Sequence, residues 1–230
     1  MKKIGRIFQS SKDWKIRKTF LKKTFDIPPS VDRLLLVMIT PTNITNYNRT
    51  QPELEEFLLF AILVAGKTAK TQAEKLNLFL QDHPVKNGTL NDKKDSPFEF
   101  IQRILNLNML KLWMMDCKLG QYNRLDKAIR GILQFKGKLD TVRLDELESV
   151  EGIGPKTARF FLLHSRPNQR IAALDTHILK YMSEKGYKVP KSTPSKKKYG
   201  QIENDFLTEC DKAGKSVADM DLEIWKSYSK

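Results

Sequence analysis

The stretch "VEGIGPKTARFF", Val150 to Phe161, decides the fold of this chain. It follows a short predicted helix, "LDELESV", and places Gly152 and Gly154 around one isoleucine, just before Pro155. Glycine at both positions can adopt positive φ angles and lets another backbone come close, as a tight turn requires. Pro155 suits the first position of a new helix, whose free N–H groups can donate to a phosphate. The pattern therefore indicates a helix–hairpin–helix that binds a nucleic-acid backbone rather than base edges.

Lys156 lies in the first turn of this second helix. The positive end of the helix dipole and the free N–H groups disfavour an ammonium there, so we expect a partly neutral amine. A neutral amine is a nucleophile toward carbon. Asp175 follows in "ALDTH", 19 residues later, between an apolar run and a helix start. Its carboxylate either caps the next helix or faces Lys156, and Lys156 itself has the alternative of a plain phosphate contact.

Helical patterns cover most of the chain and predict an all-α fold. "PELEEFLLFAILVAG", from Pro52 to Gly66, is apolar on nearly all sides and predicts a central buried helix. The run "VDRLLLVMI", residues 31–39, fits a helix or a strand. Residues 84–97 are expected to form a polar loop and residues 188–199 a basic linker. Further helices are predicted over residues 13–25, 67–83, 97–110, 121–137, 139–154, 156–166, 176–187, 200–214 and 217–228.

The composition points to a polyanionic partner. The 230 residues include 41 Lys and Arg against 27 Asp and Glu, which gives a net charge of +14, and nucleic acid is the first candidate for such a chain. The alternative is a merely soluble basic protein. No apolar run reaches the roughly 20 residues that span a bilayer, and the first residues do not form a secretory signal. We therefore expect an intracellular protein, in the cytoplasm or nucleoid if the source is prokaryotic.

Cysteine usage excludes two kinds of site. Cys117 and Cys210 are the chain's two cysteines and lie far apart in the sequence. A disulfide is not expected in a reducing compartment, and two thiols cannot supply the four ligands of a [4Fe–4S] cluster.

Together with "IAALDTHILKYM", the hairpin stretch resembles the helix–hairpin–helix–Gly/Pro/Asp superfamily of DNA base-excision glycosylases. The resemblance covers Leu144–Met182, with weaker helical similarity back to Pro52. It implies two helical lobes with a DNA-binding cleft between them. We expect the hairpin, at about 144–163, within a lobe of residues 53–167, and a second lobe built from residues 1–52 and 168–230.

The resemblance also implies a mechanism. Lys156 would attack C1′ of a flipped nucleoside, and Asp175 would stabilise the positive charge that develops on the sugar. Superfamily members that only hydrolyse the glycosidic bond lack this lysine. The implied activity is therefore that of a bifunctional DNA glycosylase and AP lyase, which forms a Schiff base and completes β-elimination. Its partner would be double-stranded DNA with a damaged base, without a membrane, and the protein is expected to be a monomer.

The substrate follows from the branch that the chain is most similar to. The absence of clustered cysteines argues against the branches that carry an iron–sulfur cluster, and the short N-terminal segment argues against the mammalian type. The closing "DLEIWKSYSK" is similar to the compact archaeal and bacterial 8-oxoguanine glycosylases. An oxidised purine, 8-oxoguanine, is then the expected target. Two alternatives stay open: a glycosylase for another damaged, mismatched or modified base, and a non-catalytic DNA-binding protein.

The resemblance assigns further contacts by position. It implies a base pocket of Phe160, Trp225 and Lys230, although Phe160 and Trp225 are also ordinary core candidates. The family holds a monovalent cation, Na⁺ or K⁺, on hairpin carbonyls, whose counterparts here are Glu148, Val150 and Ile153; no other cofactor is expected. The predicted DNA contacts are Gly152, Gly154, Lys67, Thr157, His177, Lys196 and Lys197. Among these, His177 has the alternative of an exposed residue at a helix start, and Lys67 that of a solvated lysine.

Overall fold

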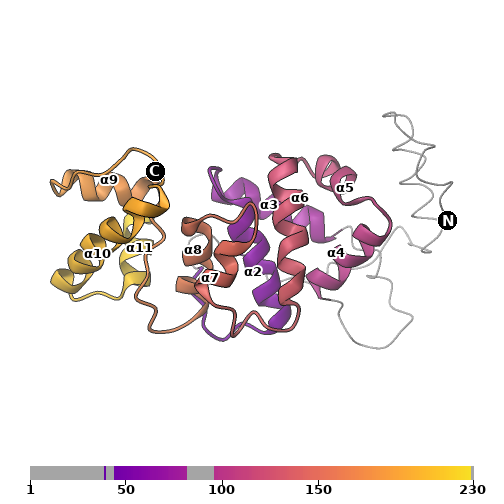
Figure 1. Ribbon diagram of the computed structural model, residues 1–230, viewed down its shortest axis with the longest axis horizontal. Helices are drawn as coiled ribbons and strands as arrows, with labels where there is room; N and C mark the ends of the chain where they lie inside the picture. The colour runs from indigo at the N-terminus through magenta and orange to yellow at the C-terminus, as the bar shows by residue number, and fades with distance from the viewer. Residues whose placement is uncertain (1–38, 40–43, 82–95, 229–230) are drawn as a thin grey trace.

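The computed structural model describes residues 39, 44–81 and 96–228, and all regular structure within these ranges is helical. The expected all-α class is therefore confirmed. Figure 1 shows α9, α10 and α11 gathered at one end of the molecule and α4 and α5 toward the other, with α7 and α8 lying between α9–α11 and α2. Within the described ranges, no helix is both long and apolar enough to cross a membrane.

The regular elements of the described ranges are all helical turns of the chain. Their bounds are α2 Gln51–Leu63, α3 Ala69–Gln81, α4 Pro97–Asn106, α5 Leu110–Asp116, α6 Tyr122–Ile132, the 3₁₀ turn η1 Leu133–Phe135, α7 Leu144–Ser149, α8 Pro155–Ser165, α9 Thr176–Glu184, α10 Lys196–Ala213 and α11 Val217–Tyr228.

The central helix α2 is buried from Leu54 to Leu63, as its sequence predicts. Its start is fixed by a capping box, in which the Thr50 N–H donates to the Glu53 carboxylate at 2.7 Å. An acidic residue near the start of α2 also stabilises a second helix. Glu55 is 2% exposed and accepts the Phe98 N–H at 2.9 Å. A buried carboxylate on α2 thereby satisfies a free donor in the first turn of α4.

Two hydrophobic clusters divide the core. The first contains residues between Ile44 and Leu162 together with Ala173, and the second contains residues between Leu163 and Ile224. Helix α8 contributes to both and packs on α2 and on α11. Ile44 belongs to the first cluster, and Ile39 packs against that cluster. The lobe boundaries given above stay a prediction.

Some of the predicted helices and loops differ from the structure, and others fall outside the described residues. A separate helix, α5, follows α4 after Asn108, whose φ of 55° ends the first helix; the sequence predicts one helix there. The lysines of the expected linker at 196–198 form the first turn of α10. The expectations for residues 13–25 and for most of 31–39 and 84–97 fall outside the described residues.

Candidate active site

The hairpin between α7 and α8 is a tight turn in which the Ile153 N–H donates to the Val150 carbonyl at 3.0 Å. Gly152 has a φ of 95°, and a Cβ there would lie 2.8 Å from the Arg124 carbonyl, so both its conformation and its neighbour require glycine. Gly154 is the extended N-cap of α8, with a φ of −94°, and a Cβ there would meet nothing within 4 Å. Gly152 therefore uses the positive φ that glycine permits, and Gly154 does not.

Arg124, on α6, holds the hairpin in place. Its guanidinium donates to the Gly152 carbonyl at 3.0 Å and to the Ile62 carbonyl, at the end of α2, at 2.8 Å. Burial lowers the pKa of this guanidinium, as expected for a cation whose described partners are neutral carbonyls. The turn is thus fixed to two helices of the first cluster.

Lys156, in the first turn of α8, is half-buried, and its Nζ lies 4.4 Å from the centre of the Phe160 ring. Burial lowers its pKa, while the carboxylates of Asp175 and Asp221 partly oppose that shift. The expected direction is confirmed, but the main cause is desolvation rather than the helix dipole on which the sequence argument relied. The structure therefore favours the neutral amine that nucleophilic attack requires.

Asp175 caps α9, as one of the two alternatives from the sequence expects. Its Oδ1 accepts the N–H groups of His177 and Ile178, each at 2.9 Å. Burial and the Asp221 carboxylate raise the pKa of Asp175, whereas Lys156 lowers it. Each of the two predicted catalytic groups thus acts on the pKa of the other, and their work at one site stays a prediction.

Sequence reasoning missed two residues of this site, Asp221 and His164. Asp221, on α11, is 7% exposed, and its carboxylate lies 3.1 Å from Nε2 of the fully buried His164. Thr45 Oγ1 lies 2.8 Å from the other ring nitrogen of His164. The sequence offers one signal for His164. Residues 156, 160 and 164 are four apart, so His164 shares a face of α8 with Lys156. Asp221 has no such local signal.

The predicted base-pocket residues have three different outcomes. Phe160 is 8% exposed and packs against Phe57 and Phe60, with ring centres 5.8 and 6.5 Å apart. Phe160 therefore belongs to the aromatic core beneath Lys156, which is the core alternative from the sequence, and its role as a wall of the base pocket stays a prediction. Trp225 is half-buried on α11, one turn beyond Asp221 and on the same helix face. Lys230 lies outside the described residues.

Two of the predicted DNA contacts are described more closely by the structure. Thr157 is only 4% exposed, so a contact by this residue falls to its N–H in the first turn of α8. Lys67 is half-buried and its Nζ donates to the Leu119 carbonyl at 2.6 Å, which uses one of the three donors of the ammonium, so its phosphate contact stays a prediction. It joins the turn after α2 to the loop after α5. Burial is the main reason that its pKa is lowered.

The other predicted contacts are accessible. His177 is half-buried at the start of α9, with its ring centre 6.5 Å from that of Tyr228. Lys196 and Lys197 are exposed in the first turn of α10, and Lys196 Nζ lies 3.7 Å from a carboxylate oxygen of Glu148, on α7. This ion pair brings the basic end of α10 against the helix that leads into the hairpin.

The hairpin carbonyls fit a hard cation in part. Among the described residues, no hydrogen-bond donor lies against the backbone carbonyls of Glu148 and Ile153, while that of Val150 already accepts one N–H. Carbonyl oxygens suit hard cations, and a second lone pair of Val150 remains. The donor set is therefore compatible with the expected ion. Within the described ranges there is no group of three or more His, Cys, Asp or Glu side chains that could hold a metal, and both cysteines are buried thiols outside any disulfide.

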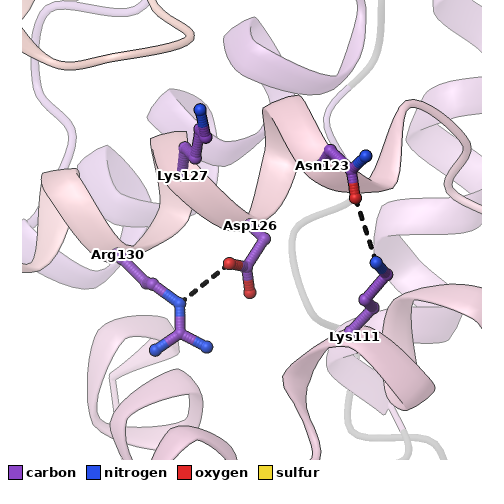
Figure 2. Close-up of a pocket in the computed structure, with 5 residues that line it drawn as sticks. All are labelled: Lys111, Asn123, Asp126, Lys127 and Arg130. Carbon is purple, nitrogen blue, oxygen red and sulfur yellow. Dashed lines mark hydrogen bonds and ion pairs between the residues drawn. The ribbon is translucent and has the colours of Figure 1, made fainter.

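A hollow of about 380 Å³ lies on α5 and α6 and is lined by residues drawn in Figure 2: Lys111, Asn123, Asp126, Lys127 and Arg130. Arg130 Nε donates to Asp126 at 2.9 Å and Lys111 Nζ to Asn123 at 3.0 Å, both dashed in the figure. Lys127 pairs with Glu151 of the hairpin. The hollow contains neither Lys156 nor Asp175, so it borders the hairpin but is not the site of chemistry.

Comparisons with known proteins agree with this geometry. Residues 114–215 match the family model described as 8-oxoguanine DNA glycosylase. The 8-oxoguanine glycosylase/lyase of Methanocaldococcus jannaschii, solved with a 15mer DNA containing 8-oxoguanine, has a TM-score of 0.57 at 22% identity, covering 96% of this chain and 92% of that one. The 8-oxoguanine DNA glycosylase of Thermotoga maritima has a TM-score of 0.56 at 19% identity, covering 94% of each chain. The chain therefore has the fold of the archaeal and bacterial 8-oxoguanine DNA glycosylases, and its residues 114–215 match the family model of those enzymes.

Proposed function

We propose that this protein is a bifunctional 8-oxoguanine DNA glycosylase and AP lyase. One observation carries the proposal: the half-buried Lys156 amine, in the first turn of the helix that follows the hairpin, has its pKa lowered by burial and is within the electrostatic reach of the Asp175 carboxylate. The fold and the family match name the substrate, since the relative from M. jannaschii was solved with DNA containing 8-oxoguanine.

Each residue has a defined task in the proposed reaction. The first turn of α8 binds a backbone phosphate through the N–H groups of Lys156 and Thr157. The damaged nucleotide is flipped out of the duplex, which costs a few kcal/mol. The neutral amine of Lys156 then attacks C1′ and the base departs. Asp175 stabilises the positive charge on the sugar, and the resulting Schiff base allows β-elimination of the 3′ phosphate.

The surroundings of the site fit a duplex partner. We place Lys196 and Lys197 on the phosphates next to the hairpin, because Lys196 already lies against α7. Trp225 is proposed to stack on the flipped base, since it is half-buried on the α11 face that carries Asp221. A monovalent cation on the carbonyls of Glu148, Val150 and Ile153 remains part of the proposal. A monomer working on DNA inside the cell is the form that this function requires.

Borohydride trapping tests the proposed chemistry. The protein is incubated with abasic duplex DNA and sodium borohydride, which reduces a Schiff base to a stable covalent adduct. The wild type should give an adduct, and Lys156→Gln should give none, with a loss of strand cleavage of about a thousandfold or more. The matched control is Lys180→Gln, a lysine on α9 whose Nζ lies 4.8 Å above the Tyr228 ring.

The substrate is tested separately with duplexes that contain 8-oxoguanine, uracil, thymine glycol or a G·T mismatch. Release of 8-oxoguanine alone supports the proposal. Release of another base with intact trapping would reassign the substrate and leave the lyase chemistry standing. DNA binding without any adduct would leave a non-catalytic helix–hairpin–helix protein.

A further inference from the structure

Three side chains line one face of α8 and connect Lys156 to a buried carboxylate. Lys156 Nζ lies 4.4 Å from the Phe160 ring centre, and that ring meets the His164 ring edge-on at 5.0 Å. His164 Nε2 then lies 3.1 Å from Asp221 Oδ2. An ionised carboxylate only accepts, so with a neutral His164 ring Nε2 donates to Asp221 and Nδ1 accepts from the Thr45 hydroxyl. Both nitrogens of the buried ring are thus used to fix the Asp221 carboxylate.

Asp221 faces the site from a third helix, α11. His164, on α8, contacts it, and the Asp221 charge also raises the pKa of Lys156 on α8, of Asp175 at the start of α9, and of Tyr199 and Cys210 on α10. Lys156 and His164 are the groups in this set that can carry a positive charge. A buried carboxylate needs such a partner, and a neutral Lys156 amine does not supply one before the reaction begins.

The proposed reaction creates the missing charge. The N–C1′ bond forms and the C1′–base bond breaks, with its electron pair leaving on the base. One amine proton passes to the base, the C1′–O4′ bond opens, and O4′ takes a proton from solvent. The product is a protonated imine on Lys156 with one net positive charge, at a half-buried position where desolvation disfavours cations.

We propose that Asp221, oriented by His164, is a positioning residue that supplies a second fixed negative charge, beside Asp175, for the protonated imine on Lys156. The inference rests on the proposed lyase function. It has a direct consequence for pH dependence, because the Asp221 charge raises the pKa of both Lys156 and Asp175. Both groups act in their deprotonated forms, so removing this charge should move the rise of rate with pH toward lower pH.

The test compares Asp221→Asn with Glu223→Gln in single-turnover excision and trapping across pH. Asn keeps an acceptor for His164 and removes the charge; Glu223 lies exposed on the same helix and loses the same charge. For Asp221→Asn, the rise should move to lower pH and the plateau rate should fall at least about tenfold, while Glu223→Gln keeps the wild-type profile. An unmoved profile, or an equal shift in Glu223→Gln, would overturn the inference.

Two further outcomes keep this inference distinct from the proposed function. A wild type that traps no adduct refutes the function itself, whereas normal trapping with an unchanged Asp221→Asn profile refutes only the role of Asp221. If Asp221→Asn does not fold, carboxyl ¹³C NMR of the wild type replaces it: Asp221 must be ionised at the assay pH, and a protonated Asp221 would overturn the inference.

Discussion

At the scale of single residues, Asp175 carries two tasks that one substitution separates. Asparagine caps helices about as well as aspartate, so Asp175→Asn should keep the acceptor for the His177 and Ile178 N–H groups. The variant loses the negative charge beside Lys156. We expect single-turnover base release to fall about a hundredfold or more, while the circular dichroism spectrum and DNA binding stay those of the wild type. Unchanged turnover would refute the assigned role.

The same variant has a stability signature with a defined sign. Asp175 has a folded pKa above its ordinary value of 3.8, so between these two pKa values the folded state holds a proton that the unfolded state has lost. Wild-type stability therefore decreases as pH rises through this window. Asparagine does not titrate, so the free energy of unfolding of Asp175→Asn, relative to wild type, should increase from pH 4 to pH 7 in urea titrations.

Sequence could identify Lys156 and Asp175 because a turn, a helix start and a cap are local features. It could not identify Asp221, which lies 57 residues from its partner His164 and meets it only where α11 packs on α8. The direction of the Lys156 pKa was also predictable, but its main cause was not, because desolvation depends on which side chains the fold places around the amine.

At the scale of elements, the two glycines of the hairpin allow the same substitution to be compared at two positions. Gly152→Ala should destabilise the fold by roughly 1–3 kcal/mol, because its φ is positive and the Arg124 carbonyl is in the way. Gly154→Ala should leave the free energy of unfolding within about 0.5 kcal/mol of wild type. It nevertheless adds a methyl group where a phosphate would approach, so DNA affinity should fall. Urea unfolding and fluorescence anisotropy measure the two effects, and wild-type affinity in Gly154→Ala would contradict the backbone grip.

Helix existence was largely readable from periodicity, and helix boundaries were less so. The α2 pattern predicts both its position and its burial, because an all-round apolar helix has only one stable location. The break between α4 and α5 escaped prediction, because a left-handed turn at Asn108 has no strong composition signal. The charge of the lysines at 196–198 suggests a linker, yet these residues form the first turn of α10.

At the scale of the whole molecule, the described residues form two cores joined through α8. The boundary passes between Leu162 and Leu163, which are neighbours on α8 but belong to different clusters. Periodicity marks an apolar stripe but not which partner covers each part of it, so the boundary inside α8 could not be predicted from sequence. The joint matters for function, because α8 carries Lys156 in its first turn and His164 in its last, and His164 Nε2 lies 3.1 Å from Asp221 on α11.

Because the net charge is +14, the salt dependence of DNA affinity tests the phosphate contacts of the molecule as a whole. Each lost phosphate contact should reduce the slope of log affinity against log salt by about 0.9, so Lys196→Gln with Lys197→Gln should flatten it by about 1 to 2. The control is Lys212→Gln with Lys215→Gln, the same charge change near the other end of α10, an 18-residue helix about 27 Å long. There Lys212 and Lys215 pair with Glu209 and Glu223. If both double variants flatten the slope equally, the positive charge of the whole molecule determines the salt dependence, and not phosphate contacts at the basic end of α10.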